Sequence, residues 1–129
     1  MSDRADEIMR LLEQAHPDAH CELNYRSGFE LLVAVILSAQ CTDRRVNLVT
    51  KDLFASYDKP EDFASMPQEK LEKLIHSCGF FRAKARSIIS ASTDIIERFG
   101  GKVPSTMEEL LTLRGVGRKT ANVVLSVAF

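Results

Sequence analysis

Residues 29–37 constrain the fold of this chain more than any other segment, because Glu30 is the one polar side chain among them. Ser27 and Glu30 have the spacing of a capping box, which predicts that a helix begins here. A helix that is apolar on nearly all sides has to be surrounded by other elements, so we expect it at the centre of a helical bundle. The run is far shorter than the roughly 20 apolar residues that cross a bilayer, so no membrane partner is expected.

Apolar residues recur at the helical period along the rest of the chain, with short turns between the stretches. The expected helix starts are Thr42 and two further capping boxes, Ser65 with Gln68 and Ser105 with Glu108. A helix stop is expected at the glycine pair 100–101. With 129 residues and no alternating strand pattern, the chain is predicted to be all-α, a single domain spanning residues 1–129 that forms a compact helical bundle.

The overall charge does not indicate a nucleic-acid binder, because a net charge of −1 lacks the basic excess that such domains usually carry. The basic residues are nevertheless clustered, at Arg44 and Arg45, at Arg82, Lys84 and Arg86, and at Arg114, Arg118 and Lys119. Clusters that share a face would make a local positive surface on a neutral protein. Solvated helix surface is the alternative for any single cluster.

The cysteines and the first residues indicate a cellular compartment. Cys21, Cys41 and Cys78 are odd in number, far apart and without CxxC spacing, which argues against a disulfide framework and against a metal site. The first residues lack the basic-then-apolar pattern of a signal peptide. We therefore expect a cytoplasmic protein, associated with the nucleoid if it binds DNA.

A glycine-containing turn separates two helical patterns in the last part of the sequence. Gly115 and Gly117 would let the chain turn with positive φ and approach another molecule closely. A turn that opens directly into a helix points free N–H groups outward, so one DNA phosphate could sit on these amides. The spacing excludes a P-loop, because Arg118 separates Gly117 from Lys119. A dinucleotide-binding fingerprint would need a glycine in place of Thr120.

This turn resembles the helix-hairpin-helix of endonuclease III-type DNA glycosylases, Leu-Pro-Gly-Val-Gly-Arg-Lys-Thr-Ala. Residues 29–43 are similar to the family's central helix and its Ser-Ala-Gln-x-Thr-Asp loop, and residues 79–85 to its Gly-aliphatic-Tyr-x-x-Lys-Ala turn. Likeness in three segments that keep the same order is far more specific than any one of them. The resemblance implies that residues 1–20 are the N-terminal helix of the family's second domain. Residues 21–129 would then be its helical DNA-binding domain, with the hairpin at residues 113–121.

What the resemblance implies is base-excision repair by a bifunctional DNA glycosylase and abasic-site lyase that acts on damaged duplex DNA, with oxidised pyrimidines as the expected substrates. The damaged base has to be flipped out, because its glycosidic bond cannot be reached inside a duplex. Lys119 matches the family's catalytic lysine, whose amine attacks the sugar C1′, forms a Schiff base and leads to β-elimination.

The resemblance also implies a set of DNA contacts. Gln40 matches the residue that enters the gap left by the flipped base, with a helix-terminal glutamine as the alternative. Phe80 stands where the family has an apolar wedge, with ordinary core packing as the alternative. The other expected contacts are Arg82, Lys84, Arg114, Gly115, Val116, Gly117, Arg118 and Thr120.

The sequence departs from the family in two ways. Arg114 replaces the hairpin proline, so the loop can be looser, although arginine adds a phosphate contact. Residues 1–129 also lack the family's Val-Asp-Thr-His segment with its catalytic aspartate, and its four-cysteine iron–sulfur loop. The bundle is thus expected to be C-terminally incomplete relative to the family, to hold no cofactor, to be weak or inactive alone, and to self-associate through uncovered apolar surface.

Three functions remain open on this basis. The chain is a glycosylase, a non-enzymatic helix-hairpin-helix module that binds the DNA backbone, or a structural bundle whose hairpin is only a packing turn. Lys119 together with Gln40 favours the first function, and the missing aspartate favours the second. Salt-sensitive DNA binding would separate the third from both.

Overall fold

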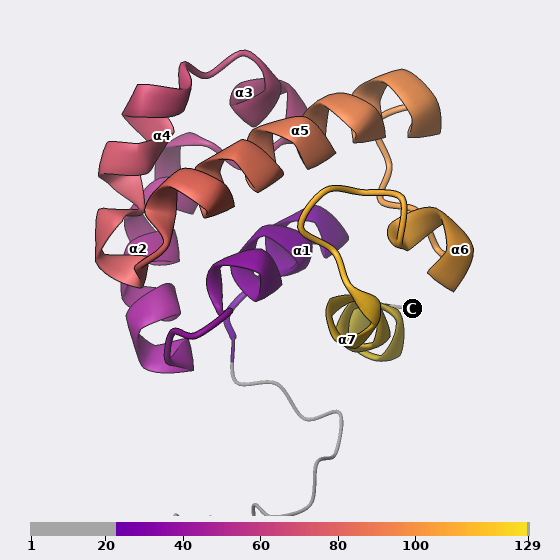
Figure 1. Ribbon diagram of the computed structural model, residues 1–129, viewed down its shortest axis with the longest axis horizontal. Coiled ribbons are helices and arrows are strands. Elements are labelled where there is room, and N and C mark those ends of the chain that lie inside the picture. The colour runs from indigo at the N-terminus through magenta and orange to yellow at the C-terminus, as the bar shows by residue number, and fades with distance from the viewer. Residues whose placement is uncertain (1–22, 129) are drawn as a thin grey trace, which may run out of the picture.

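The computed structural model describes residues 23–128, which form seven α-helices and one 3₁₀ helix and contain no strand (Figure 1). These elements are α1 (Gly28–Leu37), α2 (Asp43–Ser56), α3 (Pro60–Ala64), α4 (Gln68–Leu74), η1 (His76–Cys78), α5 (Phe81–Phe99), α6 (Met107–Leu110) and α7 (Arg118–Ala128). The prediction of an all-α fold is confirmed. The helix expected at residues 1–20, and Cys21, lie outside the described residues.

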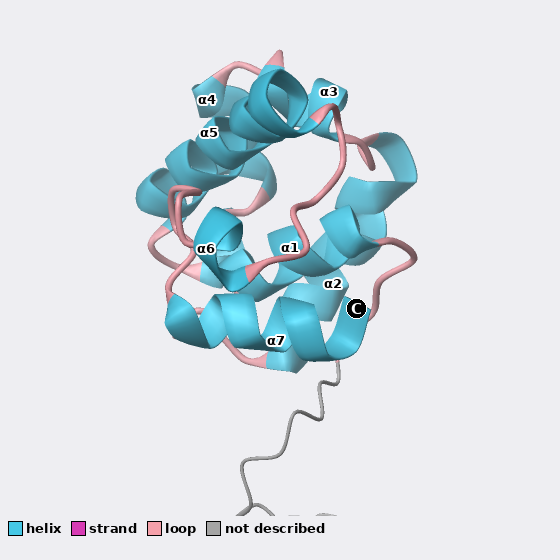
Figure 2. Ribbon diagram, turned by 90° about the vertical axis from the view of Figure 1, so that its right-hand side faces the viewer, coloured by secondary structure: helices cyan, strands magenta, loops and turns pink. Residues whose placement is uncertain are grey.

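Helix α1 lies inside the bundle, as its apolar sequence predicts. Every residue from position 29 to position 37 is buried, Glu30 included. Helix α5 crosses one side of α1, while α7 packs on the other side, and α3 and α4 cover the outer face of α5 (Figures 1 and 2). The chain is therefore layered around α1, and the segments that leave its two ends come to the surface.

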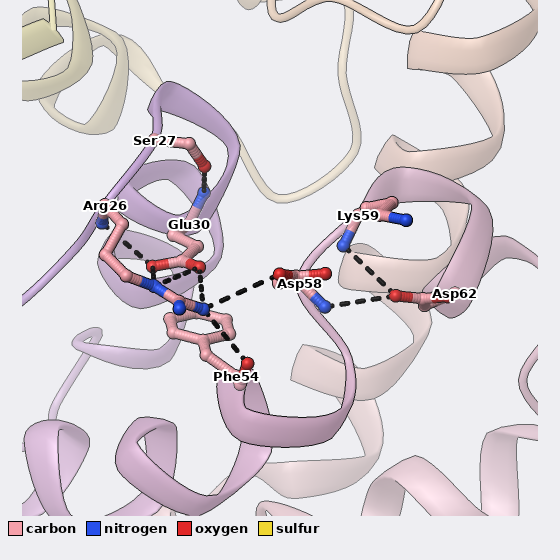
Figure 3. Close-up of polar contacts among 7 residues, drawn as sticks. All are labelled: Arg26, Ser27, Glu30, Phe54, Asp58, Lys59 and Asp62. Carbon is pink, nitrogen blue, oxygen red and sulfur yellow. Dashed lines mark hydrogen bonds and ion pairs between the residues drawn. The ribbon is translucent and has the colours of Figure 1, made fainter.

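The buried carboxylate of Glu30 is paired at the start of α1. The Ser27 Oγ accepts a hydrogen bond from the Glu30 amide at 3.1 Å, as the capping box predicts. The Glu30 carboxylate, however, accepts from Arg26, from its backbone N–H at 2.8 Å and from its guanidinium at 2.7 Å (Figure 3). Arg26 also donates to the Phe54 carbonyl at 3.1 Å, so the pair joins the start of α1 to the end of α2. A buried carboxylate needs such partners, because burying an unpaired charge is unfavourable.

The capping box expected at Ser65 and Gln68 is wrong. Helix α4 begins at Gln68 with Pro67 at the N-cap position, and no side chain caps it. The Ser65 hydroxyl instead donates to the Glu61 carbonyl at 3.0 Å, one turn back in α3. The hydroxyl therefore satisfies an unpaired carbonyl at the end of one helix and not an amide at the start of the next.

The other expected helix boundaries are close to those observed. Thr42 caps α2 by accepting from the Arg45 amide at 3.1 Å. The box expected at Ser105 and Glu108 occurs one residue later, where the Thr106 Oγ1 accepts from the Glu109 amide at 3.2 Å. Helix α5 ends at a left-handed glycine, as expected from the glycine pair 100–101. Within residues 23–128, no helix combines the length and the apolar character needed to cross a membrane.

Because α1 holds the bundle together, we expect Leu32→Ala to lower the free energy of unfolding by about 2–5 kcal/mol. The Leu32 side chain is fully buried, so its removal leaves a cavity that the surrounding helices cannot close. Leu48→Ala is the matched control, since Leu48 is 54% exposed, and it should change stability by less than about 0.5 kcal/mol. Urea unfolding measures both variants. Equal losses in the two would contradict the central position of α1.

Candidate nucleic-acid interface

A hollow of about 290 Å³ brings together three segments that are far apart in the sequence. It lies where the chain leaves α1, enters α5 and turns toward α7. The residues that line it are Ile36, Ala39, Gln40, Phe80, Ala83, Lys84, Ser87 and Gly115. A larger cavity of about 630 Å³, between residues 24–26 and α2, contains none of the residues that the sequence suggests for DNA contact. The smaller hollow is therefore the candidate site.

Gln40 and Phe80 have backbone conformations that are unfavourable for their residue types. Among residues 23–128 they are the only non-glycine residues with positive φ, at 55° and 46°. Such left-handed conformations cost L-residues about 1–2 kcal/mol each and tend to occur at functional sites. Both residues line the same hollow, so the strain is concentrated where three segments meet.

The side chains of these two residues are available to a partner. Phe80 is 67% exposed, more than any other large hydrophobic residue among those described, which excludes the core-packing alternative. Gln40 is also exposed, and it lies in the loop beyond α1, whose last helical residue is Leu37. The Phe80 ring and the Gln40 amide are thus both open to contact with another molecule.

The hairpin turn packs against α5 through Gly115. Its φ is +82°, and a Cβ added there would lie 2.6 Å from the Ser87 Cβ. Gly117 has no positive φ and faces open space, so the expectation that both glycines need this conformation is wrong. Gly115 lets the turn approach α5 closely, which a residue with a side chain would prevent. Ser87, which no sequence signal indicated, is the surface that it meets.

The sequence suggested that Val116 contacts DNA, but its side chain does not face the solvent. Its side chain is only 6% exposed and belongs to the core together with Leu113. Its amide donates to the Leu113 carbonyl at 3.2 Å and is not directed outward. Val116 and Leu113 therefore anchor the hairpin, because they lie on either side of its turn and both side chains are buried in the bundle.

The start of α7 presents unpaired backbone amides. Gly117, Arg118 and Lys119 are exposed, and Thr120 is half-buried. The structure gives the amides of residues 117–120 no acceptor within residues 23–128, and the first helical hydrogen bond is Ala121 N–H to the Gly117 carbonyl at 2.9 Å. Free amides and a helix dipole favour an anion at this end of the helix.

The expected basic residues occupy different environments. Arg114 and Arg118 are exposed on the hairpin, and Arg82 is exposed at the start of α5, with its guanidinium 5.0 Å from the Phe81 ring centre. Lys84, expected to contact phosphate, is instead buried in this structure, where its Nζ donates to the carbonyls of Leu37 and Cys78. Burial lowers the pKa of the Lys84 amine.

Lys119, the expected nucleophile, is exposed on the first turn of α7 but does not line the hollow. Within residues 23–128, no group of three or more His, Cys, Asp or Glu side chains is placed to hold a metal ion. Burial, with a smaller contribution from the neighbouring Cys41 thiol, raises the pKa of Cys78 to about 11. The exposed groups that line the hollow thus include an aromatic ring and an amide, while guanidinium groups, free backbone N–H groups and the Lys119 amine are exposed on the hairpin and at the starts of α5 and α7.

Comparison with known proteins shows which family the chain resembles. Residues 33–127 match the family described as HhH-GPD superfamily base excision DNA repair protein. The chain is 55% identical over 126 residues to Endonuclease III of Synechocystis sp., covering 98% of this chain and 58% of that protein. It is 57% identical over 113 residues to Endonuclease III of Bacillus subtilis, covering 88% of this chain and 52% of that protein.

Solved structures show the same likeness. A non-covalent Endonuclease III–DNA complex superposes with a TM-score of 0.84 at 52% identity, covering 95% of this chain and 59% of that one. A thermostable thymine-DNA glycosylase superposes with a TM-score of 0.77 at 26% identity, covering 95% of this chain and 56% of that one. The chain thus spans a little over half the length of the relatives it matches.

The two glycines of the hairpin allow a matched test of its packing. We expect Gly115→Ala to lower the free energy of unfolding by about 2 kcal/mol or more, because the new Cβ meets Ser87 and the left-handed backbone is strained. Gly117→Ala should stay within about 1 kcal/mol of the wild type, since its position is open and its φ is not positive. Urea unfolding compares the two variants. A larger loss at Gly117 would disprove this account.

Proposed function

Because the chain belongs to the HhH-GPD superfamily of base excision DNA repair proteins, we propose that it binds damaged duplex DNA and acts there as a glycosylase and abasic-site lyase. The observation that carries this proposal is the meeting of Gln40 and Phe80, both strained and exposed, with the hairpin residue Gly115 at one hollow. The likeness to a DNA-bound Endonuclease III supports it.

In this proposal the hairpin holds the DNA backbone. One phosphate accepts hydrogen bonds from the free amides at the start of α7, where the helix dipole also favours it. Arg82, Arg114 and Arg118 add contacts to neighbouring phosphates, which position the duplex without reading its sequence. A net charge of −1 is compatible with this function, because Arg114 and Arg118 are both exposed on the hairpin and can make a local positive surface there.

Gln40 and Phe80 act on the base stack. The exposed Phe80 ring inserts between base pairs and keeps the duplex kinked. The Gln40 amide enters the space of the flipped nucleotide and hydrogen bonds to the base left without a partner. Their left-handed backbones are what the proposal requires, since each side chain has to project from a short loop into the DNA.

Lys119 is the proposed nucleophile. Its neutral Nζ bonds to the sugar C1′ while the bond from C1′ to the base breaks, and the base leaves with the electrons of the broken bond and takes up a proton released by Nζ. The C1′–O4′ bond of the sugar then opens, which gives a protonated imine between Nζ and C1′. This imine makes the C2′ proton acidic, and loss of that proton expels the 3′ phosphate and nicks the strand. Residues 1–129 lack the Val-Asp-Thr-His segment, so we expect them to remove bases weakly by themselves and to react more readily with an abasic site that is already formed.

A second candidate is a binding module without catalysis. It is favoured by one observation, that Lys119 does not line the hollow formed by the other candidate residues. Both functions predict salt-dependent binding to duplex DNA, but only the glycosylase and lyase function predicts a covalent intermediate.

Borohydride reduction separates these two functions. With a duplex that contains an abasic site, we expect the wild-type chain to form a covalent adduct, because the reductant converts an imine into a stable amine. Lys119→Ala should abolish the adduct, while Lys102→Ala, at another exposed lysine, should leave it unchanged. Denaturing electrophoresis measures the adduct. An adduct that persists in Lys119→Ala would rule out this nucleophile, and none in the wild type would favour the binding module.

Binding measurements test the roles proposed for Gln40 and Phe80. We expect Gln40→Ala and Phe80→Ala each to weaken binding to a duplex with a stable abasic analogue by about 1–3 kcal/mol, with little change for intact DNA. Arg118→Ala should weaken binding to both duplexes alike and reduce the slope of log affinity against log salt by about one. Fluorescence anisotropy gives these affinities, and Leu48→Ala is the control for the loss of an exposed apolar side chain. Equal losses on both duplexes in Phe80→Ala would argue against a wedge.

A further inference from the structure

The buried amine of Lys84 has an unusual set of partners. Lys84 lies in the first part of α5, is only 5% exposed, and its Nζ donates to the Leu37 carbonyl at 2.8 Å and to the Cys78 carbonyl at 2.9 Å. No carboxylate among residues 23–128 forms an ion pair with it. Burying an ammonium group without a counter-ion opposes folding, so two neutral acceptors alone do not explain why a lysine stands here.

The positions of the two carbonyls suggest what this amine does. Leu37 is the last residue of α1, and the loop that follows it carries Gln40. Cys78 is the last residue of η1, and Gly79 then leads into Phe80. The carbonyls at a helix C-terminus lack helical partners and carry a partial negative charge, which suits an ammonium donor. One amine thus holds the points at which both strained loops leave their helices.

The cysteines of the two loops meet at the same place. The Cys41 thiol, next to Gln40 in the chain, lies close enough to the Cys78 thiol to raise its pKa, and both thiols act on the charge of Lys84. The two loops therefore come together at the Lys84 amine and the two thiols. Lys84 also lines the hollow beside Gln40 and Phe80.

We propose that Lys84 is a positioning residue, whose amine fixes the loops after α1 and η1 so that Gln40 and Phe80 project together toward DNA. The two hydrogen bonds set the distance between the loops, and this distance determines whether both side chains can enter one site in the duplex. The consequence for DNA rests on the proposed function. The effect on the loops does not, because it is a property of the free protein.

Lys84→Met tests this role, since it keeps an unbranched side chain only one atom shorter and removes the donors. In the DNA-free chain we expect faster hydrogen exchange at the amides of Cys41 and Gly79, which donate to the carbonyls of Ser38 and His76 within the two loops. Exchange inside α1 and α5 should stay as in the wild type. Ser92→Ala is the matched control, because Ser92 is a buried polar residue of α5 that bonds only to the Ile88 carbonyl of its own helix.

Binding gives the second readout. We expect Lys84→Met to lose the preference for the abasic duplex by about the same factor as the double variant Gln40→Ala with Phe80→Ala. Combining all three substitutions should add little, since residues that act through one another are not additive. Ser92→Ala should keep the preference even where it lowers the melting temperature. Unchanged preference in a folded Lys84→Met chain, or fully additive losses, would overturn the proposal.

The two readouts separate this inference from the proposed function. A wild-type chain that does not distinguish abasic from intact DNA would count against the proposed function, and exchange in the free chain would still decide the role of Lys84. If Lys84→Met does not fold, Lys84→Gln takes its place, because its side chain is one atom shorter than that of lysine and carries no charge. Faster exchange at Cys41 and Gly79 in that variant supports the inference, and wild-type exchange overturns it.

Discussion

Because every residue from position 29 to position 37 is buried, α1 has to be enclosed by other helices, and these are α2, α5 and α7. This burial determines where the ends of α1 emerge. At its start, Arg26 and Glu30 neutralise each other beside the end of α2. At its end, the chain leaves the core through a short loop, and Gln40 in this loop is left-handed and exposed. The loop that carries Gln40 thus reaches the surface as a consequence of how tightly the helix before it is held.

The candidate site depends on close backbone packing more than on charge. The hairpin reaches α5 because Gly115 has no side chain to meet Ser87, and it stays there because Leu113 and Val116 are buried on either side. The free amides at the start of α7 are then held in place before any ligand arrives. Such preorganisation means that binding an anion requires little further ordering of the protein.

The buried Lys84 shows how a charged residue at a site can act on the backbone around it. Its amine stabilises carbonyls that end two helices, and these helix ends carry the strained residues of the hollow. Strain at a site persists only when the surrounding structure holds it. In this chain the packing of α1, the turn at Gly115 and the Lys84 hydrogen bonds together hold it.

Local sequence patterns determined much of this protein. The helical periods predicted the all-α fold, the burial of α1 and the stop at residues 100–101, because these depend on neighbours within a turn or two along the chain. The segments that contain Gln40, Phe80 and Gly115 could also be identified as candidate DNA contacts, because their sequences resemble three motifs of one family. Only the tertiary structure decided that these three line one hollow, that Lys84 and Val116 are buried, and that Gly115 but not Gly117 needs a left-handed backbone. The physical reason is that burial and close approach are set by elements distant in the sequence, which a local pattern does not contain.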